Sequence, residues 1–206
     1  SELKNIALKI LSNGKGILAT DESTGTMTKR LASVNVESTE ANRLLFRESL
    51  FSSSSVKNCI GGVILYDETI RQKTSNGVTI PELIISNGSV PGIKVDTGTY
   101  LLAGSKNEKI TEGLDRLRDR LAEYYKLGAR FTKWRGVYSI SNDKPSKLCI
   151  AANAQSLARY AALVQECGMV PIIEPEVLMD GDHSAQTCLE KTSEVILKCF
   201  EEMELN

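Results

Sequence analysis

The stretch Ala129-Arg-Phe-Thr-Lys-Trp-Arg-Gly-Val-Tyr138 decides the fold, because two cations alternate with apolar residues in a segment typical of a buried strand. Its counterpart is Ile172-Ile-Glu-Pro-Glu-Val177, which carries two carboxylates at the same spacing. Side chains two residues apart in a strand lie on one face, so Lys133 and Arg135 share a face. Unpaired charges are costly to bury. We therefore expect neighbouring strands whose charges pair with one another or bind a charged substrate.

The two glutamates of the second stretch, Glu174 and Glu176, flank Pro175. Proline lacks an N–H donor, which suits the end of a strand. Two carboxylates beside a lysine could perform general acid–base chemistry, with the lysine deciding which carboxylate is protonated. The alternatives are that the glutamates are solvated loop residues and that Lys133 and Arg135 form surface salt bridges.

The composition is that of an ordinary globular protein. The 206 residues suffice for one domain with a hydrophobic core, and 41% of them are hydrophobic and 25% charged. The net charge of −1 creates no field that would attract nucleic acid or a membrane. No apolar run approaches the roughly 20 residues that span a bilayer. We expect neither nucleic acid nor a membrane as a partner.

The cysteines and the histidine limit the chemistry. An odd number of widely spaced cysteines in apolar patterns indicates buried, reduced thiols in the cytoplasm: Cys59, Cys149, Cys167, Cys188 and Cys199. His183 is the only histidine, which excludes a multi-histidine zinc site. The stretch Asp180-Gly-Asp-His183 lacks the further carboxylates of an EF-hand and is interpreted as a turn. We expect no metal and no cofactor.

Apolar strands and amphipathic helices alternate along the chain. The predicted strands are 16–21, 60–67, 92–98, 129–138 and 172–177. The predicted helices are 3–13, 37–51, 114–124, 151–167 and 184–203. A turn-rich stretch follows the second strand, with Asn76-Gly77 and Asn87-Gly88 as turn signals. Strands this apolar are typical of a parallel sheet covered by helices.

This alternation predicts an α/β protein with five β/α units in a single domain, residues 1–206. Polar side chains follow four of the strands at their C-terminal ends, where a β/α barrel has its active site. Among them, Lys94 and Asp96 share a face and form either a structural ion pair or part of a site. A complete barrel has eight strands and about 250 residues, so an open five-stranded sheet is an alternative. The chain looks interrupted before a next strand.

The segment after the first strand is a second candidate site. Asp21 could act in catalysis, or it could simply cap the next turn. The loop Ser23–Thr26, followed by Lys29 and Arg30, could hold a phosphate through hydroxyls, backbone N–H groups and positive charge. It is not a P-loop, because the Gly-Lys-Ser/Thr ending is missing.

Taken in order, these segments resemble the class I fructose-bisphosphate aldolases, glycolytic lyases that form a Schiff base. The motifs that carry the resemblance are Gly14-Lys-Gly-Ile-Leu-Ala-Thr-Asp-Glu-Ser-Thr-Gly25, Gly92-Ile-Lys-Val-Asp96, Gly128-Ala-Arg-Phe-Thr-Lys-Trp-Arg135 and Pro171-Ile-Ile-Glu-Pro-Glu176. Supporting matches are Thr39–Arg43 and Asp180–His183. The resemblance implies a β/α (TIM) barrel that reversibly cleaves fructose 1,6-bisphosphate to dihydroxyacetone phosphate and glyceraldehyde 3-phosphate.

The resemblance also implies four catalytic residues. Asp21 matches the aspartate that assists proton transfer and cleavage of the C–C bond. Lys133 matches the lysine beside the Schiff base. Glu174 matches the acid–base glutamate of carbinolamine dehydration, and Glu176 matches its neighbour in the site.

Five further residues match positions near the phosphates of the sugar substrate. Arg135 matches a phosphate ligand, and Lys94 matches an active-site lysine near the distal phosphate. On that same side lie Thr26, Lys29 and Arg30. Many family members have a serine in place of Thr26, so the hydroxyl is retained.

The Schiff-base lysine of the family, in a Leu-Leu-Lys-Pro-Asn motif, is absent and would be expected beyond Asn206. We therefore expect the 206-residue chain alone to be inactive. The family further implies a homo-oligomer, a tetramer, and a complementary C-terminal fragment is a candidate partner. Two alternatives remain open: another phosphosugar barrel enzyme that uses Glu174 as its base, and a non-catalytic fragment with a binding or assembly role.

Overall fold

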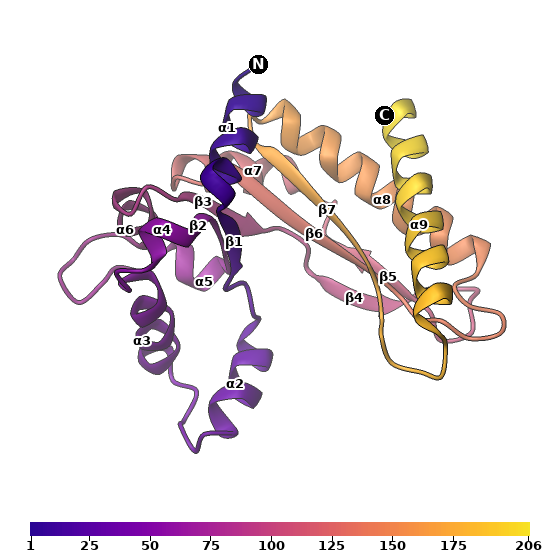
Figure 1. Cartoon of the computed structure of the whole chain (residues 1–206), viewed down its shortest axis with the longest axis horizontal. Coiled ribbons are helices and arrows are strands. Elements are labelled where there is room, and N and C mark those ends of the chain that lie inside the picture. The colour runs from indigo at the N-terminus through magenta and orange to yellow at the C-terminus, as the bar shows by residue number, and fades with distance from the viewer. The chain divides into compact units, whose positions relative to one another are not determined.

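The computed structural model describes all residues from Ser1 to Asn206, and helices separate the five predicted strands (Figure 1). The first half contains α1 (Glu2–Ile10), η1 (Ser12–Gly14), β1 (Gly16–Ala19), α2 (Thr24–Ala32), α3 (Glu40–Phe51), α4 (Val56–Cys59), β2 (Ile60–Leu65), α5 (Asp67–Ile70), α6 (Ile80–Ser86) and β3 (Val90–Lys94). The second half contains β4 (Gly98–Leu101), β5 (Lys109–Glu112), α7 (Leu117–Lys126), β6 (Phe131–Tyr138), α8 (Lys147–Glu166), β7 (Val170–Val177) and α9 (Ala185–Leu205).

The five predicted strands form one sheet in the order β1-β2-β3-β6-β7. The pairs β1–β2 and β2–β3 are parallel, with Gly62 opposite Val90 in the second pair. A hairpin of β4 and β5 forms a separate antiparallel sheet, in which Gly98 lies opposite Glu112. The sequence analysis did not predict this hairpin.

The chain divides into two compact units. The first contains residues 1–94, 122–132 and 168–170, and the second contains residues 95–121, 133–167 and 171–206. Strands β6 and β7 begin in the first unit and continue in the second.

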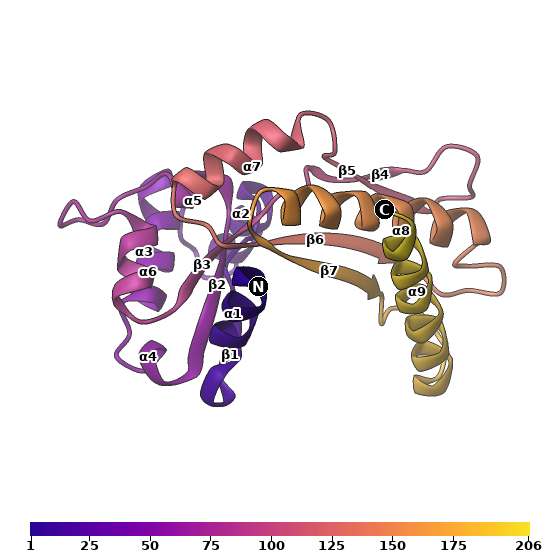
Figure 2. The same cartoon turned by 90° about the horizontal axis from the view of Figure 1, so that it is seen from above.

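In the first unit, helices α1, α5 and α6 pack against β2 and β3 (Figure 2). The end of α1 comes so close to β2 that only glycine fits there. A Cβ atom on Gly61 would lie 1.7 Å from the carbonyl oxygen of Ile10. Further along the sheet, a Cβ atom on Gly92 would lie 2.4 Å from the ring of Phe131. The glycines of β2 and β3 therefore leave room for the end of α1 and for the ring of Phe131.

In the second unit, helix α8 lies along β6 and β7 in both ribbon views (Figures 1 and 2). The ring of Tyr160 is 5.3 Å from that of Trp134, and its hydroxyl donates to the carbonyl oxygen of Ile172 at 3.2 Å. A further apolar cluster contains Tyr138, Cys149, Ile150 and Val195.

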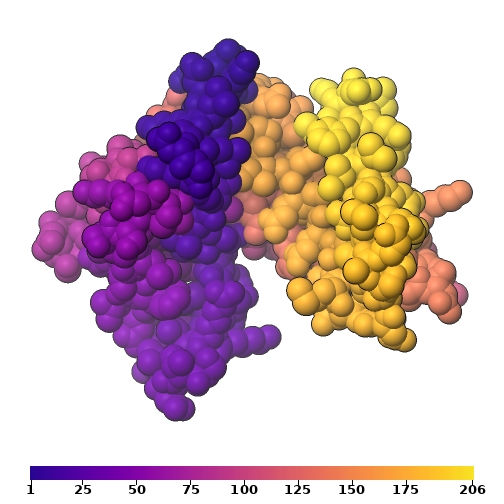
Figure 3. Space-filling view, viewed as in Figure 1, coloured from indigo at the N-terminus to yellow at the C-terminus, as the bar shows by residue number.

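Helix α9 lies at the surface of the second unit, where Figure 3 shows its residues in yellow. It buries Val195 and Cys199 and leaves Leu197 and Phe200 exposed. None of the helices combines the length and apolar character that crossing a membrane requires.

One local prediction is wrong and one helix was missed. The turn signals Asn76-Gly77 and Asn87-Gly88 do lie in turns between β2 and β3, but the segment also contains α6, which was not predicted. This helix begins with a capping box of Thr79 and Glu82, a signal that the sequence offered. The predicted loop Ser23–Thr26 is instead the N-cap and first turn of α2, because the Ser23 hydroxyl accepts a hydrogen bond from the Thr26 backbone N–H.

The cysteines are partly as predicted. Cys149 and Cys199 are buried, and burial raises the pKa of each thiol to about 11. Cys59, by contrast, is exposed at the end of α4.

Candidate active site

The charged residues of β6 and β7 pair as the strand periodicity predicts. Lys133 Nζ lies 3.0 Å from Glu174 Oε2. One step further along both strands, Arg135 Nε donates to a carboxylate oxygen of Glu176. The prediction of neighbouring strands with complementary charges is therefore confirmed. Strand β6, Phe131–Tyr138, ends where the predicted strand 129–138 ends.

The two ion pairs differ in burial. The Lys133 side chain is only 11% exposed, whereas Glu174 is 38% exposed. An ammonium group this buried needs a partner, because its unpaired charge would be strongly destabilising. The pair thus joins a buried cation to a carboxylate that solvent can reach. This is a suitable arrangement for an acid–base group that meets a substrate.

Arg135 is held by its backbone as well as by its side chain. Its N–H donates to Asp96 Oδ2 at 3.4 Å, and its carbonyl accepts from the Thr111 hydroxyl at 2.6 Å. Burial alone would lower the pKa of Arg135, but the hydrogen bond to Glu176 and the nearby carboxylates raise it. The guanidinium is thus a permanent cation beside a 38% exposed carboxylate.

The sequence analysis left two roles open for Asp96, a structural ion pair or part of a site, and in the structure Asp96 binds backbone N–H groups. Its second oxygen, Oδ1, accepts from the Gly98 backbone N–H at 3.1 Å. Asp96 therefore links the start of the β4–β5 hairpin to the backbone of β6.

In the first unit, Asp21 lies two residues beyond β1 and is buried. The residue before it is tightly fixed, because both the N–H and the hydroxyl of Thr20 donate to the carbonyl of Ile64, at 2.9 and 2.8 Å. Asp21 thus lies directly beyond the carboxyl end of its strand, as the sequence analysis predicted.

The other predicted residues of the first unit lie on α2 and β3. Thr26 is in the first turn of α2, with its hydroxyl 3.2 Å from that of Ser23. Lys29 and Arg30 are exposed in the last turn, where Arg30 pairs with Glu22. Lys94 is the last residue of β3 and is half-buried. Five of the predicted residues therefore lie in the first unit and four in the second.

Comparison with known proteins shows the family of the chain. The family model for glycolytic class-I fructose-bisphosphate aldolase matches residues 2–206. The chain belongs to this aldolase family. Among named relatives, the probable fructose-bisphosphate aldolase class 1 of Xanthomonas campestris is 53% identical over 97% of this chain. The cytosolic fructose-bisphosphate aldolase 6 of Arabidopsis thaliana is 52% identical over the same share.

A solved aldolase has the same fold as this chain. The Plasmodium falciparum fructose-bisphosphate aldolase, solved with TRAP and a small-molecule inhibitor, superimposes with a TM-score of 0.96 and 44% sequence identity over 98% of this chain. This match confirms the predicted β/α-barrel fold class. The chain spans 59% of that structure's chain and 60% and 56% of the Xanthomonas and Arabidopsis relatives.

This aldolase-family chain also contains a cluster that the sequence analysis missed. Arg43 and Arg47 lie one turn apart on α3 and are buried, although arginine is rarely buried. Arg43 forms two hydrogen bonds to Glu68, at 2.9 and 2.5 Å. The sequence signal was an arginine pair at i and i+4 within a helix that also carries apolar residues.

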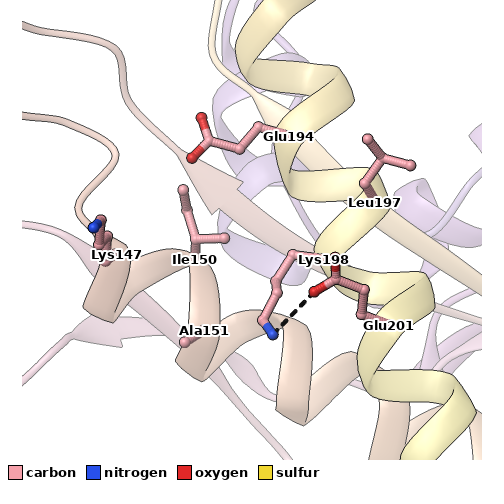
Figure 4. A pocket seen from close by; sticks show the side chains of 7 residues that line it. All are labelled: Lys147, Ile150, Ala151, Glu194, Leu197, Lys198 and Glu201. Carbon is pink, nitrogen blue, oxygen red and sulfur yellow. Dashed lines mark hydrogen bonds and ion pairs between the residues drawn. The ribbon is translucent and has the colours of Figure 1, made fainter.

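A cavity of about 440 Å³ lies away from the predicted residues, between α8 and α9 (Figure 4). It is lined by Lys147, Ile150, Ala151, Glu194, Leu197, Lys198 and Glu201. Lys198 points toward Glu201 at 3.2 Å, and Glu194 pairs with Lys191 at 2.7 Å. Because none of the predicted site residues lines this cavity, we do not assign the aldolase chemistry to it. No group of three or more His, Cys, Asp or Glu side chains could hold a metal ion.

Proposed function

We propose that this chain supplies the acid–base part of a class I fructose-bisphosphate aldolase active site. The reaction is the reversible cleavage of fructose 1,6-bisphosphate to dihydroxyacetone phosphate and glyceraldehyde 3-phosphate. The family match over residues 2–206 supports this proposal. The observation that carries it is the 3.0 Å pair between buried Lys133 and the more exposed Glu174.

In this mechanism, a lysine outside residues 1–206 forms the Schiff base with the substrate ketone. Glu174 gives a proton to the carbinolamine hydroxyl, which leaves as water, and an iminium results. The adjacent Lys133 ammonium then stabilises the Glu174 carboxylate that remains. When the C3–C4 bond breaks, its electron pair passes to the iminium, and Asp21 takes part in the accompanying proton transfer. Glu176 orients Arg135 through their ion pair.

Five residues are proposed to bind the phosphates of the substrate. A guanidinium offers two parallel N–H donors to a phosphate, so Arg135 suits a defined phosphate position. On α2, Thr26 adds a hydroxyl in the first turn, where the helix dipole also favours an anion. Lys29, Arg30 and Lys94 add positive charge.

The domain organisation, the oligomeric state and the cellular location are also proposed from the family. We expect residues 1–206 to belong to one barrel domain and the complete enzyme to be a homo-oligomer, a tetramer, in the cytoplasm. The cytosolic relative from Arabidopsis supports the location. A complementary C-terminal segment is the partner that would supply the Schiff-base lysine.

The test is to complete the barrel. Residues 1–206 are joined to the C-terminal part of the Xanthomonas relative that this chain does not match, and cleavage of fructose 1,6-bisphosphate is measured. We expect turnover by the completed protein and none by residues 1–206 alone. A folded but inactive completed protein would contradict the proposal.

A second measurement separates the aldolase from an isomerase or epimerase. Borohydride reduces an iminium to a stable amine, so it should inactivate the completed protein only when dihydroxyacetone phosphate is present. Inactivation that does not depend on this ligand would argue against a Schiff base.

A further inference from the structure

Arg47 is a completely buried arginine that lies outside the proposed catalytic residues. Its side chain has no exposed surface. Its guanidinium donates to the hydroxyl of Thr69 at 2.9 Å and to the backbone carbonyl of Glu22 at 2.6 Å. Arg47 therefore joins α3 to two segments, one after β1 and one after β2.

The charge of Arg47 is compensated by two carboxylates that do not reach normal hydrogen-bond distance. Glu22 Oε2 lies 3.7 Å away and Glu68 Oε2 lies 3.9 Å away. Burial lowers the pKa of Arg47, and both carboxylates oppose that change.

Two polar atoms of this cluster, Arg47 Nε and Glu22 Oε2, are buried without a hydrogen-bond partner. Such atoms are destabilising, and a buried ion pair is weak evidence of stabilisation. The ion pairs alone therefore do not explain a buried arginine at this position. Its bond to a backbone carbonyl provides an explanation.

That carbonyl belongs to the residue directly after Asp21. On the other side of Asp21, Thr20 makes two hydrogen bonds to Ile64. The backbone of Asp21 is thus held at both neighbours, by the sheet before it and by Arg47 after it. Ser23, the N-cap of α2, follows at once.

We propose that Arg47 is a positioning residue that fixes the segment Asp21–Glu22, and through it the Asp21 carboxylate. The proposal rests on the proposed function only in the role given to Asp21. Misplacing a reacting group by about 1 Å can lower a rate by about a hundredfold, so this anchor would affect turnover without touching the substrate.

The variant Arg47→Lys tests the anchor. A lysine keeps the charge, but its single ammonium group cannot reproduce the two-pronged contact to Thr69 and Glu22. The matched control is Arg43→Lys, which disturbs the other buried arginine of α3. Arg43 bonds Glu68 and Ser38 rather than Glu22.

The first readout is amide hydrogen exchange in residues 1–206. In Arg47→Lys we expect the amides of Thr20 and Met27, which flank the anchored segment, to exchange at least tenfold faster relative to those of β2. In Arg43→Lys this ratio should not change. Equal acceleration throughout the first unit, or in both variants, would overturn the proposal. If Arg47→Lys does not fold, Thr69→Val removes one acceptor of Arg47 and should shift the same ratio.

The second readout is the kinetics of the completed enzyme. We expect Arg47→Lys to lower kcat by about tenfold or more while KM changes less than about threefold, because Asp21 acts in the chemical step. Arg43→Lys should keep the wild-type kcat. Wild-type kcat in Arg47→Lys would overturn the proposal. Because hydrogen exchange needs no activity, it decides the anchoring by Arg47 even if the proposed function fails.

Discussion

The two units each contain two cations facing two carboxylates, yet the groups differ in burial and in what they hold. On α3 of the first unit, Arg43 and Arg47 bond backbone carbonyls as well as side chains. In the second unit, Lys133 and Arg135 meet carboxylates on the next strand that are 38% exposed. Buried arginines bonded to backbone fix the course of loops. Ion pairs with exposed carboxylates can exchange partners with a substrate. A similar set of charges can therefore form a scaffold in one unit and, under the proposed function, a reaction site in the other.

The largest expected effect is on catalysis in the second unit. We predict that Lys133→Ala lowers the turnover of the completed enzyme by at least about a hundredfold, the scale of general acid–base contributions. The measurement is steady-state cleavage of fructose 1,6-bisphosphate. Lys191→Ala is the control, because Lys191 pairs with Glu194 on α9. Near-wild-type turnover of Lys133→Ala would contradict the catalytic role of Lys133.

The next largest effect is on the stability of the first unit. Arg47→Met leaves the Thr69 hydroxyl and the backbone carbonyl of Glu22 without their donor, although Glu22 and Glu68 keep their ion pairs with Arg30 and Arg43. A buried polar group that loses its hydrogen-bond partner costs about 1–3 kcal/mol, so we predict a loss in this range. Urea unfolding of residues 1–206 measures the loss. A change below about 1 kcal/mol, the scale of an exposed pair, would contradict the scaffold role.

The pairing of charged side chains could be predicted from the sequence in the second unit but not in the first, for a physical reason. Lys133 and Arg135 are two residues apart on one strand, so local periodicity gives their common face. The anchor of Arg47 needs Glu22, which follows β1, and Glu68 and Thr69, which lie in α5, so its partners are distant in sequence. Only the packing of α3 brings these residues together, and no local sequence pattern predicts that packing.

A smaller effect is expected for Arg135 of the second unit, which should contribute to substrate binding rather than to stability. Arg135→Gln should change the unfolding free energy by less than about 1 kcal/mol, because an ion pair 40% exposed contributes little. Its loss should instead raise KM for the bisphosphate, because a charged donor to phosphate is removed. A large loss of stability with unchanged KM would place Arg135 in the scaffold.

The smallest effect is a pH dependence in the first unit. The hydrogen bond from Arg43 lowers the pKa of Glu68 below its value in the unfolded chain, about 4.3. The pairing therefore adds stability above that pH and loses it as the pH falls through the folded pKa. We predict that the unfolding free energy of Glu68→Gln declines less steeply between about pH 5 and the acid limit. An unchanged slope would show that Glu68 does not carry this dependence.

The most direct test of the reaction site is the rate at which the Schiff base forms. Completed wild-type enzyme and Glu174→Gln are mixed with dihydroxyacetone phosphate, quenched with borohydride after short times and weighed by intact-mass spectrometry. A glutamine cannot donate the proton that carbinolamine dehydration needs. We therefore predict that the reduced adduct accumulates at least about a hundredfold more slowly in Glu174→Gln. Equal rates in the two proteins would contradict the acid–base role of the Lys133–Glu174 pair.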